Sequence, residues 1–246
     1  MLDKSISEVS AFNRGVYNAA EGLRLLNFTR NPVANVKHIS RQTVSRWLRG
    51  YDHGQEPAHH SEPLWRPDYE NDDGQIELSF RDLIELRFVK AFRDLGLSLP
   101  TIRECFKRAA DEVQDDRPFS TQRFRTDGKT IFLEITDKLK VEEGKMIDLR
   151  RRQNVFRTII EPSLRDLEFD ADVVARWFPL GISRRNIVID PSRAFGRPIV
   201  NSAGVPTEVL ANAIETEGSI DKVARLFEVS SAEVREARSF EERLAA

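Results

Sequence analysis

Residues 40–51, SRQTVSRWLRGY, form the stretch around which the rest of the chain is organised. Ser40 is a residue type favoured at the start of helices, and Gly50 is a type favoured just past their end. Three apolar residues between them recur at helical spacing and would share one face: Val44, Trp47 and Leu48. The stretch therefore predicts a short helix that packs on a core along one side.

The rest of this helix would carry only cationic and uncharged polar side chains, since no acidic residue interrupts it. The set comprises Ser40, Arg41, Gln42, Thr43, Ser45, Arg46 and Arg49. Hydroxyl, amide and guanidinium groups are the groups that hydrogen-bond phosphates and base edges in a major groove. We interpret the helix as a recognition helix and expect these seven residues to contact DNA.

The charge of the chain is distributed unevenly along its 246 residues, a length typical of about two domains. Residues 1–50 carry 8 Lys and Arg against 3 Asp and Glu, whereas residues 201–246 carry 5 against 9. A basic start and an acidic end predict different partners for the two ends. A single cysteine, Cys105, excludes an intrachain disulfide framework and a multi-cysteine metal site. The sequence shows neither a secretory signal nor a membrane-length apolar run, so we expect a cytoplasmic protein without membrane contact.

A first helix is predicted over Tyr17–Leu26, and Asn31-Pro32 would end it. Its buried side would consist of small and apolar residues: Ala19, Ala20, Leu23 and Leu26. Two short helices joined by a turn, the second basic outside, match the helix-turn-helix plan. The alternative is an ordinary helical hairpin with a solvated charged face.

The stretch that follows, residues 51–79, is acidic and contains His53, His59 and His60. Nothing in it repeats at a convincing metal-ligand spacing, so we interpret its first part as a solvated loop and expect no metal or cofactor. Leu64–Tyr69 and Gln75–Leu78 predict a small hairpin around a turn at residues 71–74. Such a wing would place Arg66 against the DNA backbone.

Two more helices are predicted. Ser79 would cap the first, which runs to Asp94, with Asp82 as the acidic partner of a capping box; the second is Ser98–Val113. Residues 15–113 resemble the winged helix-turn-helix domain of MerR-type regulators, on a pattern carried by Leu83, Leu86, Leu95, Gly96, Ser98, Leu99 and Ile102. The resemblance implies operator binding, as a two-fold dimer on a palindromic site. The long acidic segment and the absence of a dimerising helix and of a cysteine cluster argue against a metal-sensing member.

Residues 117–200 have a more β-type composition. They predict a hairpin of Thr121–Arg125 with Lys129–Ile135, strands at Val155–Ile160 and Arg185–Ile189, and a short helix at Pro162–Leu167. A basic cluster, Arg150–Arg152 with Arg157, fits a solvated face better than a nucleic-acid site. No nucleophile, phosphate loop or catalytic histidine context is visible, so we expect no enzyme activity.

Three short helices are predicted at the C-terminal end, opening at Thr207, Ser219 and Ser231. Their pattern, with the preceding GRPIV and GVPTEVL, resembles the small helix-turn-helix domain of VapB-like bacterial antitoxins. That resemblance implies a PIN-like ribonuclease toxin as partner. Val205-Pro206 stand where this family usually has an arginine, which leaves the role of that arginine open.

Charge separates the two helix-turn-helix units, because each phosphate contact needs a cation. The C-terminal unit carries Glu228, Glu233 and Glu236 on or beside the helix that would be its recognition helix. We expect these carboxylates to bind the basic RNA cleft of a ribonuclease toxin. A purely structural or dimerising module is the alternative.

The sequence thus predicts a mainly α, α+β protein. We expect a flexible arm at 1–14, a MerR-like winged helix-turn-helix DNA-binding domain at 15–115, a β-containing linking or dimerisation region at 116–195, and a small antitoxin domain at 196–246. The predicted function is that of a type II antitoxin that neutralises a PIN-like toxin and autoregulates its operon. The alternative is a stand-alone MerR-like regulator with a small effector.

Overall fold

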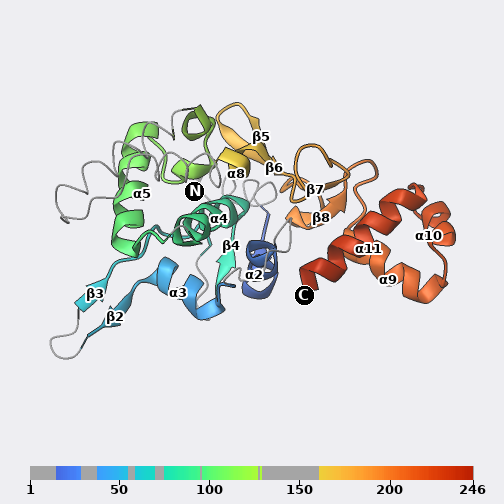
Figure 1. Cartoon of the computed structure of the whole chain (residues 1–246), viewed down its shortest axis with the longest axis horizontal. Helices are drawn as coiled ribbons and strands as arrows, with labels where there is room; N and C mark the ends of the chain where they lie inside the picture. Colours follow the sequence, from blue (N-terminus) through green and yellow to red (C-terminus); the bar gives the residue numbers. More distant parts are fainter. Residues whose placement is uncertain are drawn as a thin grey trace, which may run out of the picture.

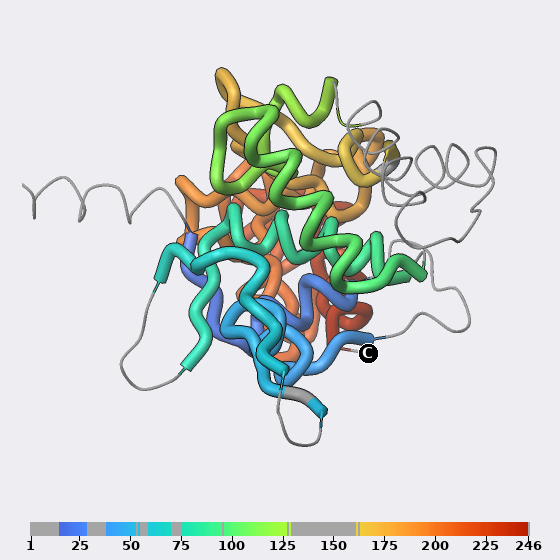
Figure 2. Tube along the Cα trace, turned by 90° about the vertical axis from the view of Figure 1, so that its left-hand side faces the viewer, coloured from blue at the N-terminus to red at the C-terminus, as the bar shows by residue number. Residues whose placement is uncertain are grey.

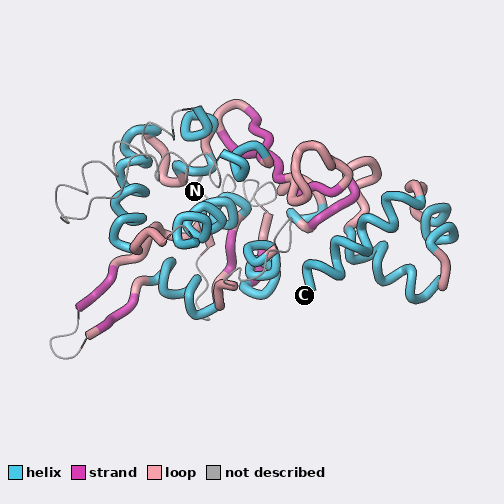
Figure 3. Tube along the Cα trace, viewed as in Figure 1, coloured by secondary structure: helices cyan, strands magenta, loops and turns pink. Residues whose placement is uncertain are grey.

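The structure is a computed structural model, and it describes residues 15–28, 38–54, 59–69, 75–94, 96–126, 128 and 161–245. These residues form a mainly helical α+β fold with small antiparallel sheets, which confirms the predicted fold class (Figure 3). The predicted arm at 1–14, the strand at Val155–Ile160 and the basic cluster at residues 150–157 lie outside the described residues. No helix within the described ranges is both long and apolar enough to cross a membrane.

The N-terminal part is built around a central helix (Figure 1). In chain order its elements are β1 (Tyr17–Asn18), α2 (Ala19–Asn27), α3 (Arg41–Arg49), β2 (Tyr51–His53), β3 (His59–Ser61), β4 (Glu77–Leu78), α4 (Phe80–Asp94) and α5 (Leu99–Val113). Strand β1 pairs with β4, and β2 pairs with β3, both antiparallel. The first helix begins two residues later than predicted, because Tyr17 and Asn18 are in a strand and Asn18 caps the helix. Of its predicted buried residues, Ala20 is exposed.

Helix α4 is the centre of the core, and burial on all its sides explains its weak amphipathic pattern. Leu83, Ile84 and Phe88 are completely buried, as is the carboxylate of Asp82. The predicted capping box is present: the Asp82 backbone N–H donates to Ser79 Oγ at 3.0 Å, and the Ser79 N–H donates to Asp82 Oδ2 at 3.2 Å.

The predicted hairpin of Leu64–Tyr69 with Gln75–Leu78 is wrong. The hairpin lies directly after α3 and pairs Tyr51 with Ser61, Asp52 with His60, and His53 with His59. Leu64 and Trp65 do not pair with a strand; instead, the Leu64 N–H donates to the Trp47 carbonyl at 2.8 Å and Trp65 Nε1 donates to Asp82 Oδ1 at 2.7 Å. The segment interpreted as a solvated loop therefore contains the projecting hairpin, at the lower left of Figure 1.

The predicted strand at Thr121–Arg125 is also wrong, because residues 122–126 are helical. The Thr121 hydroxyl accepts a hydrogen bond from the Phe124 N–H at 3.1 Å, so this residue acts as a helix cap. A short 3-10 turn, η1 (Pro118–Ser120), precedes it. The predicted partner strand at residues 129–135 lies outside the described residues.

A four-stranded antiparallel sheet follows a short helix, α8 (Glu161–Arg165). Its order is β5 (Leu167–Asp170), β6 (Val173–Trp177), β7 (Ile187–Ile189) and β8 (Pro198–Val200), with the turn η3 (Ala194–Gly196) before β8. The predicted helix near Pro162–Leu167 and the strand ending at Ile189 are confirmed, while the sequence missed the other three strands.

Three helices complete the chain: α9 (Thr207–Glu217), α10 (Ile220–Leu226) and α11 (Ser231–Ala245). Their predicted starts are confirmed, and Leu210, Val223 and Val234 form the core between them. Two apolar residues of these helices are exposed, namely Val209 at 41% and Leu226 at 63%.

Glu85 on α4 gives the core a pH dependence. Burial raises the pKa of its carboxyl to about 8, although the backbone N–H groups of Phe119 and Ser120 donate to it and Arg81 and Arg117 oppose the shift. The folded state therefore keeps a proton that the unfolded state releases near pH 4.5. Stability contributed by this proton is present at low pH and lost as pH rises towards 8.

We expect Glu85→Gln to flatten this part of the pH profile. Relative to the wild type, the variant should gain stability between pH 5 and pH 8, because it has no proton to lose. Urea denaturation at both pH values measures the difference. Equal slopes for the two proteins would contradict a buried, protonated Glu85.

Candidate nucleic-acid interface

Helix α3 has the limits and the cap that its sequence predicts. It spans Arg41–Arg49, and the Ser40 hydroxyl accepts from the Thr43 N–H at 3.2 Å. Its apolar face is buried: Val44 is 3% exposed, Trp47 4% and Leu48 3%. The chain leaves the helix at Gly50, where φ is +73° and an added Cβ would lie 2.4 Å from the Ser61 carbonyl oxygen. Only glycine fits there, and it sends the chain straight into β2.

The polar side of α3 is open to solvent. Ser40, Arg41, Gln42, Arg46 and Arg49 are exposed, and Thr43 and Ser45 are half-buried. The structure therefore gathers the seven predicted residues on one short helix, with a cationic surface that no carboxylate of that helix neutralises. Such a surface can approach a phosphate backbone and present amide and guanidinium groups to base edges.

Two contacts orient the arginines while leaving them accessible. The Arg46 guanidinium lies over the Tyr51 ring, 5.4 Å from its centroid, and Arg49 Nη2 donates to the Gln75 carbonyl at 3.1 Å. Tyr51 begins β2, so α3 and the hairpin form one continuous surface. This role of Tyr51 was not predicted from the sequence, although an aromatic residue just after an arginine-rich helix is a recognisable signal for a cation–π contact.

The hairpin of β2 and β3 has two faces, and Asp52 and His60 share one of them. Side chains on a strand point alternately to opposite faces, so Asp52 and His60 lie on the face away from Tyr51 and Ser61. Asp52 Oδ1 and His60 Nδ1 are 2.7 Å apart, and this hydrogen bond raises the pKa of His60. The carboxylate of Asp52, the first one after α3 in the chain, therefore points away from the face on which Arg46 lies.

Asn27 connects the two helices of the pair. Its Nδ2 donates to the Ile39 carbonyl at 3.0 Å, and its Oδ1 accepts from the Ile39 N–H at 2.8 Å. Ile39 immediately precedes the cap of α3, so the end of α2 fixes where α3 begins. This link could not be predicted from local sequence, because it joins residues 12 positions apart.

A buried charge network lies behind α3. Arg117 Nε donates to Asp82 Oδ1 at 2.9 Å, and Nη2 lies 3.2 Å from Asp68 Oδ1. Trp65 Nε1 donates to the same Asp82 oxygen, and the neighbouring Leu64 N–H donates to the Trp47 carbonyl. The network therefore ties α3 to the core.

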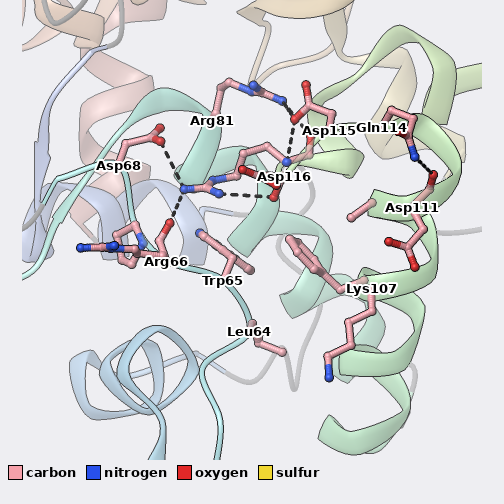
Figure 4. Close-up of a pocket in the computed structure, with 14 residues that line it drawn as sticks. Leu64, Trp65, Arg66, Asp68, Arg81, Lys107, Asp111, Gln114, Asp115 and Asp116 are labelled. Atoms are coloured by element: carbon pink, nitrogen blue, oxygen red, sulfur yellow. Dashed lines mark hydrogen bonds and ion pairs between the residues drawn. The ribbon is translucent and has the colours of Figure 1, made fainter. Parts of the chain in front are cut away.

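A groove of about 1010 Å³ opens above this network, between α5 and the segment that carries Leu64 to Asp68 (Figure 4). Lys107 and Asp111 line it from α5, Gln114 lines it from the C-cap of that helix, and Asp115 and Asp116 line it at one end. Charges of both signs surround it. Among the described residues no group of three or more His, Cys, Asp or Glu side chains is arranged to hold a metal ion.

Arg66 lies in the irregular segment after β3 rather than in a strand, and its side chain is exposed. Its backbone carbonyl accepts from Arg117 Nη2, which anchors the segment to the core. The structure does not group Arg66 with the polar face of α3 through any contact described above, so its role in DNA binding stays a prediction.

The three C-terminal glutamates differ in their surroundings. Glu233 completes a capping box with Ser230 and accepts from the Ser202 hydroxyl at 2.6 Å, contacts that lower its pKa. Glu236 accepts from Asn186 Nδ2 at 2.7 Å. Glu228 is exposed in the turn before α11, at a left-handed φ of +55°. Two of the three carboxylates are thus engaged within the chain.

Comparison with solved structures identifies a protein of the same fold. The crystal structure of Rv2018 from Mycobacterium tuberculosis superposes with a TM-score of 0.66 at 19% identity, over 90% of this chain and 96% of that one. The two chains therefore share a fold. A curated protein of Mycobacterium tuberculosis (strain ATCC 25618 / H37Rv), named "Putative antitoxin VapB45", is 24% identical over 210 residues, which is 81% of this chain and 87% of that protein. No protein-family model matches the chain.

Proposed function

We propose that the chain is a VapB-like antitoxin that binds its own operator through α3 and neutralises a PIN-like ribonuclease toxin through its C-terminal part. The observation that carries the proposal is the exposed, carboxylate-free face of α3, supported on a hairpin and a capped helix pair. The likeness to a protein named as an antitoxin, over 81% of the chain, supports the role.

DNA binding by α3 follows from its charge and its position. The first 50 residues carry 8 Lys and Arg against 3 Asp and Glu, and phosphate neutralisation supplies most non-specific affinity for DNA. Gln42, Arg46 and Arg49 would then read base edges, while Ser40, Arg41, Thr43 and Ser45 would bind phosphates. A two-fold dimer on a palindromic site would place two such helices in successive major grooves.

Toxin binding is the second half of the proposal. Residues 201–246 carry 5 Lys and Arg against 9 Asp and Glu, which is complementary to a cleft that binds RNA. Of the three glutamates, Glu228 is the one best placed to meet a partner, because Glu233 and Glu236 have hydrogen-bond partners within the chain.

One observation favours the second candidate, a stand-alone regulator with a small effector. The groove beside α5 has the volume of a small-molecule site, and its wall includes Trp65, whose neighbour Leu64 bonds to the carbonyl of Trp47 on α3. A ligand there could therefore act on the recognition helix. The groove has a largely charged wall, whereas small-molecule sites are mostly apolar.

Co-expression with the product of the adjacent gene tests the proposal. We expect a stable complex whose nuclease activity is suppressed, and we expect Glu228→Lys to weaken the complex about tenfold or more because it reverses a complementary charge. Glu112→Lys, an equally exposed charge reversal on α5, is the matched control and should leave the complex unchanged. If the adjacent product neither binds nor shows nuclease activity, the antitoxin role falls and the regulator becomes the better account.

A further inference from the structure

Helix α11 belongs to two cores at once. In its first half, Val234 and Ala237 are completely buried among the C-terminal helices. In its second half, Phe240 and Leu244 join the core formed by the N-terminal helices. The end of α11 lies beside α2 in Figure 1, and the perpendicular view of Figure 2 agrees. The C-terminal unit is therefore packed directly on the first helix of the DNA-binding pair.

The contact combines rings and charges. The ring centroids of Phe240 and Phe28 are 4.9 Å apart, and the Arg243 guanidinium lies over the Phe28 ring, 4.8 Å from its centroid. Glu241 Oε2 is 3.3 Å from Arg24 Nη2 on α2, and Glu241 Oε1 accepts from the Thr207 hydroxyl at the start of α9. Glu241 thus connects the C-terminal helices to α2.

The position of this contact matters for α3. Phe28 is the C-cap of α2 and follows Asn27, whose amide makes both hydrogen bonds to Ile39. Ile39 precedes Ser40, the cap of α3. A shift of Phe28 would therefore be passed through two residues to the start of the recognition helix.

We propose that Phe240, Glu241 and Arg243 are positioning residues for operator recognition, acting through α2 without touching DNA. This inference rests on the proposed DNA binding by α3. It gives the C-terminal unit a role in orienting the DNA-binding surface, in addition to its proposed role in toxin binding. The orientation of α2 sets whether Arg46 and Arg49 reach the base edges, so loss of the contact should reduce operator preference more than non-specific binding.

Charge reversal gives the sharpest test, because electrostatics predicts tighter binding to both DNAs, whereas positioning predicts a lower ratio of operator affinity to scrambled-DNA affinity. Glu241→Arg replaces a negative with a positive charge, which by simple electrostatics should tighten binding to any DNA. Positioning predicts instead that the ratio of operator affinity to scrambled-DNA affinity falls about fivefold or more. Adding Arg24→Glu restores an oppositely charged pair and should return most of that ratio. Fluorescence anisotropy with both DNAs, on full-length protein, measures it.

Two further readouts separate positioning from general destabilisation. Val234→Ala removes buried volume from the same helix, away from α2, and should leave the ratio unchanged. Amide hydrogen exchange of Thr43 and Val44 should speed up in Glu241→Arg, relative to the wild type, more than it does in Val234→Ala. An unchanged or higher ratio in Glu241→Arg, no recovery in the double variant, or an equal loss of the ratio in Val234→Ala would overturn the inference. A wild type without operator preference would instead overturn the proposed function, and this inference with it.

Discussion

Replacing Arg46 and Arg49 together with alanine should lower operator affinity by about 30-fold or more, since each such contact contributes about 1–3 kcal/mol. Both side chains are exposed on α3, and their contacts within the chain, to Tyr51 and to the Gln75 carbonyl, are surface contacts. The fold should therefore survive the change. A gel-shift titration with the promoter fragment measures the loss, and neutralisation of the toxin should persist.

The matched control is Arg235→Ala with Arg238→Ala. These arginines are also exposed, also three residues apart and also on a helix, α11, so the same charge is removed from the chain. Operator affinity should fall only by the small non-specific effect of net charge. Equal losses in the two double variants would show that total charge, and not the face of α3, determines binding.

Arg117→Ala should lower the free energy of unfolding by about 3–5 kcal/mol, because it leaves the buried carboxylate of Asp82 without its cation. Asp82 is completely buried and Arg117 is 6% exposed. The backbone carbonyl of Arg66, which Arg117 also binds, would lose a donor. Urea denaturation followed by circular dichroism measures the change.

Two comparisons keep this prediction specific. Arg238→Ala breaks an exposed pair with Glu242, whose side chains are 53% and 62% exposed, and should cost less than about 1 kcal/mol. Adding Asp82→Asn to Arg117→Ala removes one stranded charge, so the double variant should lose less than the sum of the single losses. Strict additivity would argue that the two groups do not act as a pair.

The sequence predicts α3 well because everything that defines the helix is local. A serine cap, three apolar residues at helical spacing and a glycine exit are all contained in residues 40–50. The capping box of Ser79 with Asp82 is predictable for the same reason. Both are confirmed by the structure.

The hairpin was misplaced because the residues that decide it act over long distances. Leu64 and Trp65 have a strand-like composition. However, Leu64 contacts Trp47 and Trp65 contacts Asp82, each 17 positions away in the sequence. The turn between β5 and β6 was not predicted because it lacks a local sequence signal. Ala171 adopts a left-handed φ of +51° there, where glycine or asparagine would have given a turn signal, so the sequence offers no warning of the two strands.

For Glu233, the sequence contained a structural signal that we interpreted as a functional one. Ser230 and Glu233 have the spacing of a capping box, and that is the contact that they make. The packing of α11 on α2 has no local signature, since Phe28 and Phe240 are far apart in the chain. Removing residues 196–246 would expose that contact, so the division of labour between the units is better tested with point variants of the full chain.

A competition titration measures whether α3 recognises a specific DNA sequence. The full-length protein is titrated with its own promoter fragment and with a scrambled fragment of equal length, at salt concentrations from about 50 to 200 mM. We expect at least about a 1000-fold preference for the promoter fragment and a steep loss of affinity as salt rises. Equal affinity for the two fragments, or binding that does not respond to salt, would contradict this expectation.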